Sequence, residues 1–443
     1  MDFKDLSPED QQAIIERVQR ARTETPALLK EGRYADAFDL VYYAALIDPE
    51  SMQLALRIAQ QTEGIHLLRP DQIEVLRQHT EEKRPLAQYL YGYWLWFNRK
   101  HATDIDRVVE LFEAASKWGI GDASYCLFRV YETGDTGLRD KRLCDHYYKL
   151  AGKQELNFKW FICKIRDHIY GRRGEQEDPE TTITILRNII GLPKDTDLRW
   201  QVDREKELET EAAQKAHPRI WKLLYECYDA LGIAWAGEIY TKMGIRQGDY
   251  GSYLDLIRCR CTDYRDEECK LLDNKLDEYE RILREGAEAG SSEMMYRLGL
   301  KLCFEWENED TTDERRAELE PEIQRWLERA SQLGNGDASE QLGMAYFNGN
   351  YGYEQNQAEA WNHFHLAAMQ GQRSAYYYLY LCAFAAQDES VPEEEREFHL
   401  PPDADPLTAE EWEALGRLVY EAADENWPGD EKYEGDEEQV VPE

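Results

Sequence analysis

Apolar residues recur at helical spacing along most of this 443-residue chain. Ala338, Leu342 and Tyr346 are four residues apart, which places them on one face of a helix. No stretch shows a clean alternation of apolar and polar residues bounded by turn residues, which is the pattern of a strand. The hydrophobic pattern therefore predicts an all-α protein.

A six-residue segment returns almost unchanged about 215 residues later, as expected of a chain built from repeats. The two copies are Gly119-Ile120-Gly121-Asp122-Ala123-Ser124 and Gly334-Asn335-Gly336-Asp337-Ala338-Ser339. Further copies follow at spacings that suit a pair of helices with two short loops, apart from one longer gap. The alanine-like position of the repeat falls at Ala87, Ala123, Phe158, Ser252, Met294, Ala338 and Ala375.

The pattern around the second copy resembles the Sel1-like repeat, a relative of the tetratricopeptide repeat. Ala338, Leu342-Gly343 and Tyr346 match its first helix, and Ala367-Ala368 followed by Gly371 match the end of its second helix. The resemblance covers roughly residues 84–385. It implies an α–α superhelix, a right-handed solenoid of stacked antiparallel helix pairs, in which the first helix of each pair lines a concave groove.

The small residues of the repeat have physical roles. Gly343 is expected to let a neighbouring helix approach closely, and Gly371 to end a helix in the left-handed conformation. Asp122 and Asp337 are expected at the N-caps of the helices that follow the junctions.

Breaks in the pattern divide the chain into six parts. We expect an N-terminal tetratricopeptide-like helical cap, a first repeat block, an insertion or bend, and a second repeat block. A proline-rich crossing segment with a capping helix and an acidic disordered tail follow; Thr408 and Glu411 form a capping-box pattern at the start of that helix. The respective ranges are 1–82, 84–170, 171–218, 219–387, 388–427 and 428–443.

Charge and composition bound the partners. The net charge is −36, and the last 53 residues hold nineteen acidic and three basic side chains. Binding to nucleic-acid phosphates is therefore not expected, whereas a basic protein partner is favoured by the field. The longest strongly apolar run, 89–97, is too short to span a bilayer, and the N-terminus is polar and acidic. These features predict a cytoplasmic protein without membrane contact.

Catalytic and metal-binding motifs are scarce. The sequence contains no H-E-x-x-H, G-x-x-x-x-G-K-[ST] or G-x-S-x-G motif. His363 and His365 point about 200° apart on a helix, and Cys259, Cys261 and Cys269 lack a second zinc-type pair. We expect no cofactor, no metal and no catalytic residue, and reduced, mostly buried cysteines.

A row of aromatic residues is the candidate for partner binding. Three residues before the Leu-Gly glycine of each copy, five of seven positions are aromatic. Aromatic side chains are favoured at recognition surfaces, although the same row could pack as ordinary core. The candidate groove residues are Tyr89, Tyr93, Trp96, Phe97, Tyr125, Arg129, Trp160, Lys164, Tyr296 and Tyr377. If they line a groove, Tyr89, Tyr93, Trp96, Tyr125 and Trp160 should be partly exposed, and Tyr91 and Trp94 mostly buried.

Three functions remain open at this stage. The first is a non-enzymatic protein–protein interaction scaffold that binds a polypeptide or peptide in its concave groove. The second is an immunity or inhibitor protein whose acidic surface neutralises a basic toxin or nuclease. The third is a hydrolase that uses groove carboxylates, for which the sequence shows no nucleophile–base constellation.

Overall fold

A computed structural model describes residues 7–30, 34–45, 48, 51, 54–55, 70–133, 138–155, 157–192, 216–262, 271–388, 390–392, 396, 398–423, 425 and 427–428. These residues form helices, with one isolated bridge between Thr262 and Leu271. The prediction of an all-α fold is confirmed. Pro49, Cys269, part of the predicted insertion (193–215) and the acidic tail from residue 429 lie outside the described residues.

Within the described residues, three N-terminal helices precede the repeats. They are α1 (Pro8–Lys30), α2 (Tyr34–Ala45) and α4 (Pro70–Glu81). The described helices then follow in pairs, each with a first and a second member. The pairs are α5 (Pro85–Asn98) with α6 (Ile105–Lys117), α7 (Gly121–Thr133) with α8 (Lys141–Ala151), α9 (Phe158–Tyr170) with α10 (Pro179–Ile189), α12 (Pro218–Ala230) with α13 (Ala234–Arg246), α14 (Ser252–Cys261) with α15 (Leu276–Ala289), α16 (Ser292–Glu307) with α17 (Asp313–Gln332), α18 (Gly336–Asn348) with α19 (Gln357–Met369), and α20 (Ser374–Gln387) with α21 (Ala409–Ala422).

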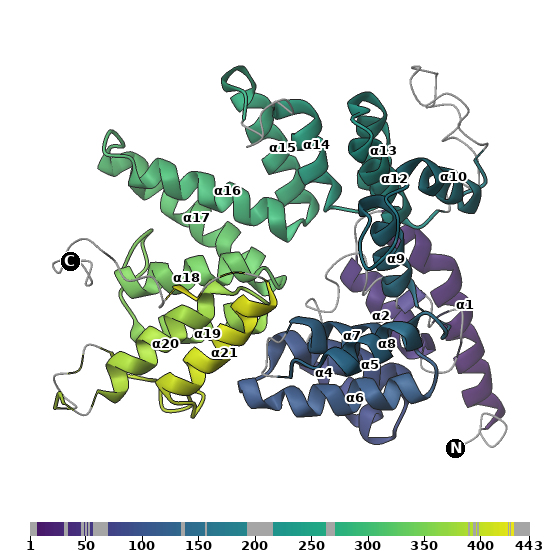
Figure 1. The fold of residues 1–443 in the computed structure, drawn as a ribbon, viewed down its shortest axis with the longest axis horizontal. Coiled ribbons are helices and arrows are strands. Elements are labelled where there is room, and N and C mark those ends of the chain that lie inside the picture. Colours follow the sequence, from purple (N-terminus) through teal and green to yellow (C-terminus); the bar gives the residue numbers. More distant parts are fainter. Residues whose placement is uncertain are drawn as a thin grey trace.

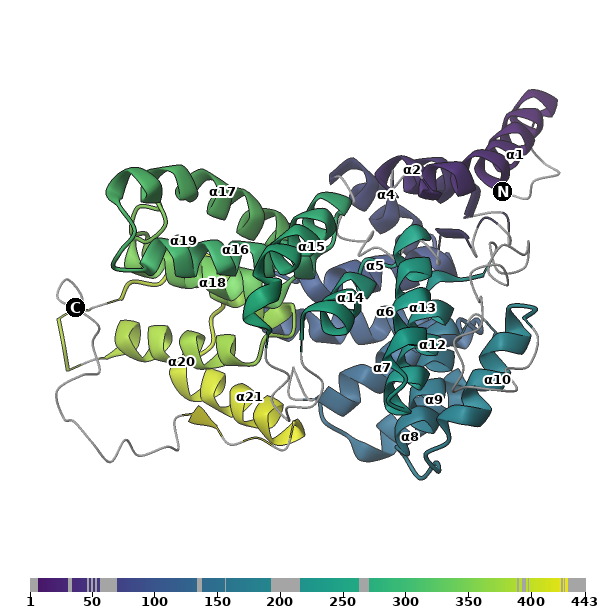
Figure 2. The ribbon, with the colours of Figure 1, turned by 90° about the horizontal axis from the view of Figure 1, so that it is seen from above.

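The stack of helix pairs curves back on itself. Successive pairs follow an arc from the blue helices through teal and green to the yellow α21 (Figure 1). At the end of this arc α19 packs against α5, and α21 packs against α7 (Figures 1 and 2). The C-terminal pairs therefore close onto the first repeat block.

Glycine at the helix crossings permits this close stacking. A Cβ atom added to Gly343 would lie 2.5 Å from Cδ1 of Phe364, and one added to Gly299 would lie 2.8 Å from Cδ2 of Leu327. The predicted role of Gly343 is confirmed. Gly371, with a φ of 91°, adopts the left-handed conformation expected where α19 ends.

The N-caps differ from the prediction. Asn335 caps α18, and its side chain accepts a hydrogen bond from the Ala338 N–H at 2.8 Å, so Asp337 lies inside the first turn. α7 begins at Gly121, which likewise places Asp122 inside the helix. The Asp122 carboxylate is fully buried and accepts from the backbone N–H of Lys159 on α9 at 2.8 Å. The assignment of both aspartates as N-caps is wrong because both helices start two residues earlier.

The C-terminal helix covers the end of the stack. Thr408 and Glu411 form the predicted capping box at the start of α21. Trp412 of this helix is fully buried in a core shared with α19 and α20, and Val419 lies in the same core. Ala102, which follows α5, belongs to that core as well. The predicted capping-box helix therefore also forms the contact that closes the arc.

The segment predicted to be an insertion or bend contains α10. This helix packs against both α9 and α12. It completes the third helix pair and joins it to the fourth.

Candidate functional site: a cavity where the arc closes

A cavity of about 630 Å³ lies between the first repeat block and the C-terminal helices. We call it the closure cavity. Its walls come from α5, α7 and the start of α9 on one side, and from α19, α20 and α21 on the other. It exists because helices about 250–300 residues apart in sequence are brought together.

The first wall is aromatic. Tyr93, Trp96 and Phe97 line it from α5, where spacings of three and four residues put them on one helix face. The ring centroids of Tyr93 and Phe97 are 5.2 Å apart in an edge-to-face contact. Tyr125 joins them from α7 and is half-buried, and its ring centroid lies 5.4 Å from that of Phe128.

The second wall is mostly apolar. Val419, Ala422 and Ala423 line the cavity from the end of α21, while Met369 and Tyr376 line it from α19 and α20. Val419, Met369 and Tyr376 are buried, and Ala422 and Ala423 are half-buried. This wall can therefore accept an apolar group against a firmly packed surface.

Basic side chains outnumber acidic ones around the closure cavity. Arg129, Lys159, Arg173 and Arg373 line it, together with the single carboxylate of Glu132. Glu132 accepts from Arg129 at 2.5 Å and from Arg173 at 2.6 Å, so one acid serves two guanidinium groups. In a chain with a net charge of −36, this is a local reversal of charge.

Lys159 differs from the other three cations. Its Nζ lies 4.0 Å from the ring centroid of Tyr93, in a cation–π contact. Arg173 also pairs with Asp167 at 2.7 Å, and Arg373 pairs with Glu425 at 2.7 Å. No carboxylate of the described residues lies within ion-pairing distance of the Lys159 ammonium group.

The thiol of Cys126 lines the cavity. Burial raises the pKa of Cys126 to about 12, so this thiol stays protonated at neutral pH. The nucleophile in cysteine chemistry is the thiolate. Cys126 therefore forms part of the wall without supplying a nucleophile.

A buried carboxylate holds the two sides together. Asp405 is 3% exposed, and its Oδ2 accepts from the Ala102 N–H at 2.7 Å across 303 residues of sequence. Nε2 of His365 lies 3.5 Å from the same oxygen. An exposed pair between Lys100 and Asp403, at 3.6 Å, lies on the same seam.

Five of the ten predicted groove residues line the closure cavity. They are Tyr93, Trp96, Phe97, Tyr125 and Arg129. Tyr93 and Tyr125 are half-buried, as expected of groove residues, whereas Trp96 is only 8% exposed.

The prediction for Tyr89 is wrong. Its side chain is 1% exposed, and its ring packs 6.2 Å from that of Phe112 on α6, so it belongs to the core. Tyr91 and Trp94, expected to be mostly buried, are half-buried and stack on each other at 5.9 Å. The buried face of α5 therefore includes Tyr89, and it is rotated about the helix axis relative to the face that the repeat pattern predicted.

Trp160 and Lys164 do not line the closure cavity. Trp160 is half-buried and packs on the end of α8, where a Cβ on Gly152 would lie 2.5 Å from its ring. Lys164 forms an ion pair with Glu175. Trp160 therefore contacts the end of the second helix pair, and Lys164 contacts the loop that follows α9.

Tyr296 and Tyr377 also lie outside this cavity. Both are half-buried, and burial raises the pKa of Tyr296 to about 12. Trp427 covers Tyr377 in an edge-to-face contact with ring centroids 5.5 Å apart. The aromatic positions predicted from the repeat therefore do not all line one cavity.

Sequence reasoning missed three of the four cavity cations. Lys159 directly precedes Trp160, so the position chosen on α9 was displaced by one residue. Arg173 follows α9, and Arg373 stands at the N-cap of α20, in a different part of the chain. Their positive charge in an acidic chain was the signal that the sequence offered. Only the closure of the arc brings these residues to one cavity.

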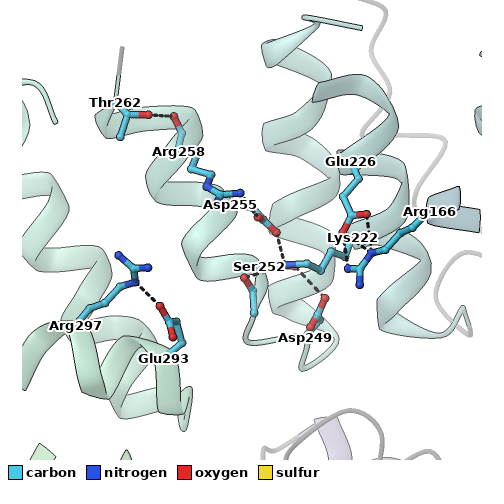
Figure 3. Close-up of polar contacts among 11 residues, drawn as sticks. Arg166, Lys222, Glu226, Asp249, Ser252, Asp255, Arg258, Thr262, Glu293 and Arg297 are labelled. Carbon is cyan, nitrogen blue, oxygen red and sulfur yellow. Dashed lines mark hydrogen bonds and ion pairs between the residues drawn. The ribbon is translucent and has the colours of Figure 1, made fainter. Parts of the chain in front are cut away.

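A second polar cluster links α9, α12 and α14 (Figure 3). Its carboxylates are almost fully buried, and each has a basic partner. The pairs are Arg166–Glu226 at 2.6 Å, Lys222–Asp255 at 2.9 Å and Arg219–Asp249 at 3.3 Å. Burial raises the pKa of Asp255, although the Lys222 ammonium opposes this shift. The first two pairs join α9 to α12 and α12 to α14, and the third joins α12 to the loop before α14.

The described part of the chain lacks metal-binding clusters and membrane-spanning helices. No group of three His, Cys, Asp or Glu side chains there is arranged to hold a metal ion. None of the described helices combines the length and apolar character needed to cross a bilayer.

Known proteins resemble this chain only distantly. No protein-family model and no curated protein matches the chain. A Sel1 repeat protein from Oxalobacter formigenes is 16% identical, with 79% of this chain and 88% of that chain covered and a TM-score of 0.36. A protective antigen from uropathogenic Escherichia coli strains that displays an SLR fold is 16% identical, with 93% and 89% covered and a TM-score of 0.34.

The chain's own features carry the resemblance in repeat type. The paired helices, the glycine at the crossing of α18 and α19, and the left-handed glycine after α19 resemble those of a Sel1-like helical repeat. The described part of the chain is an all-α stack of helix pairs, as the sequence predicted.

Proposed function

We propose that this protein is a non-enzymatic interaction scaffold that binds a polypeptide segment in the closure cavity. The observation that carries the proposal is the aromatic wall of α5 and α7, which faces an apolar wall across about 630 Å³. Pockets of this size commonly hold a ligand group buried on most sides. The cavity suits a few side chains of a peptide better than a whole helix.

The composition of the walls supports recognition. Tyrosine and tryptophan combine a large apolar area with a polar tip and lose little conformational entropy on binding. Tyr93 and Tyr125 are half-buried, so part of each ring remains available to a partner. Burial raises the pKa of Tyr125, so its hydroxyl stays protonated and can donate a hydrogen bond.

The test is a peptide selection followed by a paired substitution. Peptides selected from a displayed random library on the full chain would be measured by fluorescence anisotropy. Tyr125→Ala should weaken the selected peptides by about 1–2 kcal/mol, roughly 5–30-fold in Kd, as for a typical aromatic contact residue. Trp118→Ala is the matched control, because Trp118 is 72% exposed and lies outside the cavity.

Two results would contradict the proposal. The first is a selection that yields no peptide of measurable affinity. The second is a set of peptides that bind equally well to the wild type and to Tyr125→Ala, since their site would then lie elsewhere.

The net charge favours a second candidate. A chain with a net charge of −36 could neutralise a basic toxin or nuclease as an immunity or inhibitor protein. Such a complex should weaken steeply with ionic strength, because surface charges are screened beyond about 8 Å at physiological salt. Binding of a basic partner that persists unchanged at about 0.5 M salt would exclude this electrostatic mechanism.

A further inference from the structure

The closure cavity has the opposite charge to the protein that surrounds it. Arg129, Lys159, Arg173 and Arg373 line it with Glu132 as the one acid of the lining, while acids exceed bases by 36 over the whole chain. Asp167 and Glu425 also pair with Arg173 and Arg373, so Lys159 is the lining cation that has no ion pair among the described residues. A half-buried cation loses hydration and gains from an opposite charge only when that charge is close. The cavity therefore favours a carboxylate and disfavours an ammonium group.

Lys159 marks where that carboxylate would lie. The face of Tyr93 contacts its ammonium group, but no carboxylate of the described residues pairs with it. Arg129 donates to Glu132 through Nη1, and its guanidinium carries further N–H groups that can donate to a ligand. Arg173 divides its donors among Glu132, Asp167 and Cys163. Lys159 and Arg129 lie on neighbouring first helices and line the same cavity.

We infer that the closure cavity selects an acidic peptide segment, in which an aspartate or glutamate side chain is flanked by an apolar residue. The carboxylate pairs with Lys159 and Arg129, and the apolar side chain packs against Val419 and Met369 of the second wall. The inference rests on the proposed function and names its partner class. It departs from the basic partner that the overall charge suggested.

Charge complementarity is the reason for choosing an acidic peptide. A lysine-rich segment would place like charges beside Lys159, which is unfavourable. The acidic exterior repels an acidic peptide at long range, so association should accelerate as salt is added. Within the cavity the short-range pairs act in the opposite sense.

Three labelled peptides and two lysine variants test the inference. The peptides alternate leucine with glutamate, glutamine or lysine, and their binding to the full chain is followed by fluorescence anisotropy. The glutamate peptide should bind about tenfold more tightly than the glutamine peptide, as for a charge-assisted hydrogen bond. Lys159→Met should remove this preference. Lys164→Met is the matched control on the same helix, because Lys164 pairs with Glu175 outside the cavity.

The outcomes separate this inference from the proposed function. Equal binding of the glutamate and glutamine peptides that is still weakened by Tyr125→Ala leaves a peptide site and overturns its acidic preference. Tightest binding of the lysine peptide also overturns it, and absence of binding by all three peptides contradicts both proposals. Displacement of the glutamate peptide by free glutamate or inorganic phosphate at equal concentration would show a small-anion site instead. Arg129→Gln provides a second test if Lys159→Met does not fold.

Discussion

Asp405 is a single buried carboxylate that joins the two ends of the arc. It is 3% exposed, and its Oδ2 accepts from the Ala102 N–H at 2.7 Å. Ala102 itself is 4% exposed, so water cannot readily replace a lost acceptor. Asp405→Ala would leave this backbone donor buried and unpaired.

The expected loss follows from that unpaired donor. A buried donor without a partner costs about 1–3 kcal/mol, and bonds to charged acceptors lie toward the upper end. We expect the free energy of unfolding to fall by about 2–3 kcal/mol in urea denaturation. The bond joins segments 303 residues apart, so its loss should also loosen the contact between α21 and α7. A larger radius of gyration in small-angle X-ray scattering would report this opening.

Asp403→Ala is the matched control. Asp403 lies two residues away on the same seam, but its side chain is 72% exposed and its pair with Lys100 is 3.6 Å long. Exposed ion pairs of this kind contribute about 0–1 kcal/mol. This variant should keep both the stability and the radius of the wild type.

The pH dependence gives an independent check. Burial alone would raise the pKa of Asp405, but the neighbouring His365 ring and the hydrogen bond from the Ala102 N–H outweigh it, so the pKa is lowered. A carboxyl group with a lowered pKa in the folded state stabilises the protein above its ordinary pKa and loses that effect as pH falls through the folded value. The stability difference between the wild type and Asp405→Ala should therefore shrink below about pH 4. A variant with wild-type stability and radius at pH 7 would refute this account of the closure.

Two further predictions concern the repeat core. Gly343→Ala places a Cβ 2.5 Å from the buried Phe364 ring, and this overpacking should lower the free energy of unfolding by about 1–3 kcal/mol. Gly251→Ala is the control and should leave that free energy unchanged, because its Cβ meets nothing closer than 3.6 Å. Equal urea midpoints for the two variants would contradict this reasoning. Burial lowers the pKa of His363 to about 4, so the unfolded state takes up a proton first as pH falls from about 6.5 toward 4, and stability is lost over that window. An NMR titration of the His363 ring with an ordinary imidazole pKa would show that the folded structure does not exclude the charged form.

The local sequence determined the helix pairs. Ala338 and Leu342 recur every four residues, and both are fully buried on α18, because helical period alone decides which side of a helix is apolar. Gly343 and Gly371 have the predicted roles, because close approach and the left-handed conformation each require the absence of a Cβ. These features depend on residues a few positions apart, and so one sequence suffices to find them.

The sequence did not predict which residues of a helix face the core when a small rotation of the helix decides this. Tyr89 and Tyr93 lie one turn apart on α5, yet the first is core and the second lines the closure cavity. Which of them faces α6 depends on the crossing angle between the helices, and the repeat pattern does not encode that angle to within one residue. The same one-residue uncertainty selected Trp160 in place of Lys159.

The closure of the arc was decided by the tertiary structure alone. Each helix pair contacts mainly its neighbours, and the small rotations between successive pairs add up along the chain. Their sum brings Asp405 to Ala102 and Arg373 to the cavity that Lys159 lines. No local pattern specifies the sum of these rotations. The sequence by itself therefore determined the helical repeat and its aromatic first block. The accumulated curvature of the stack determined which residues face each other across the cavity.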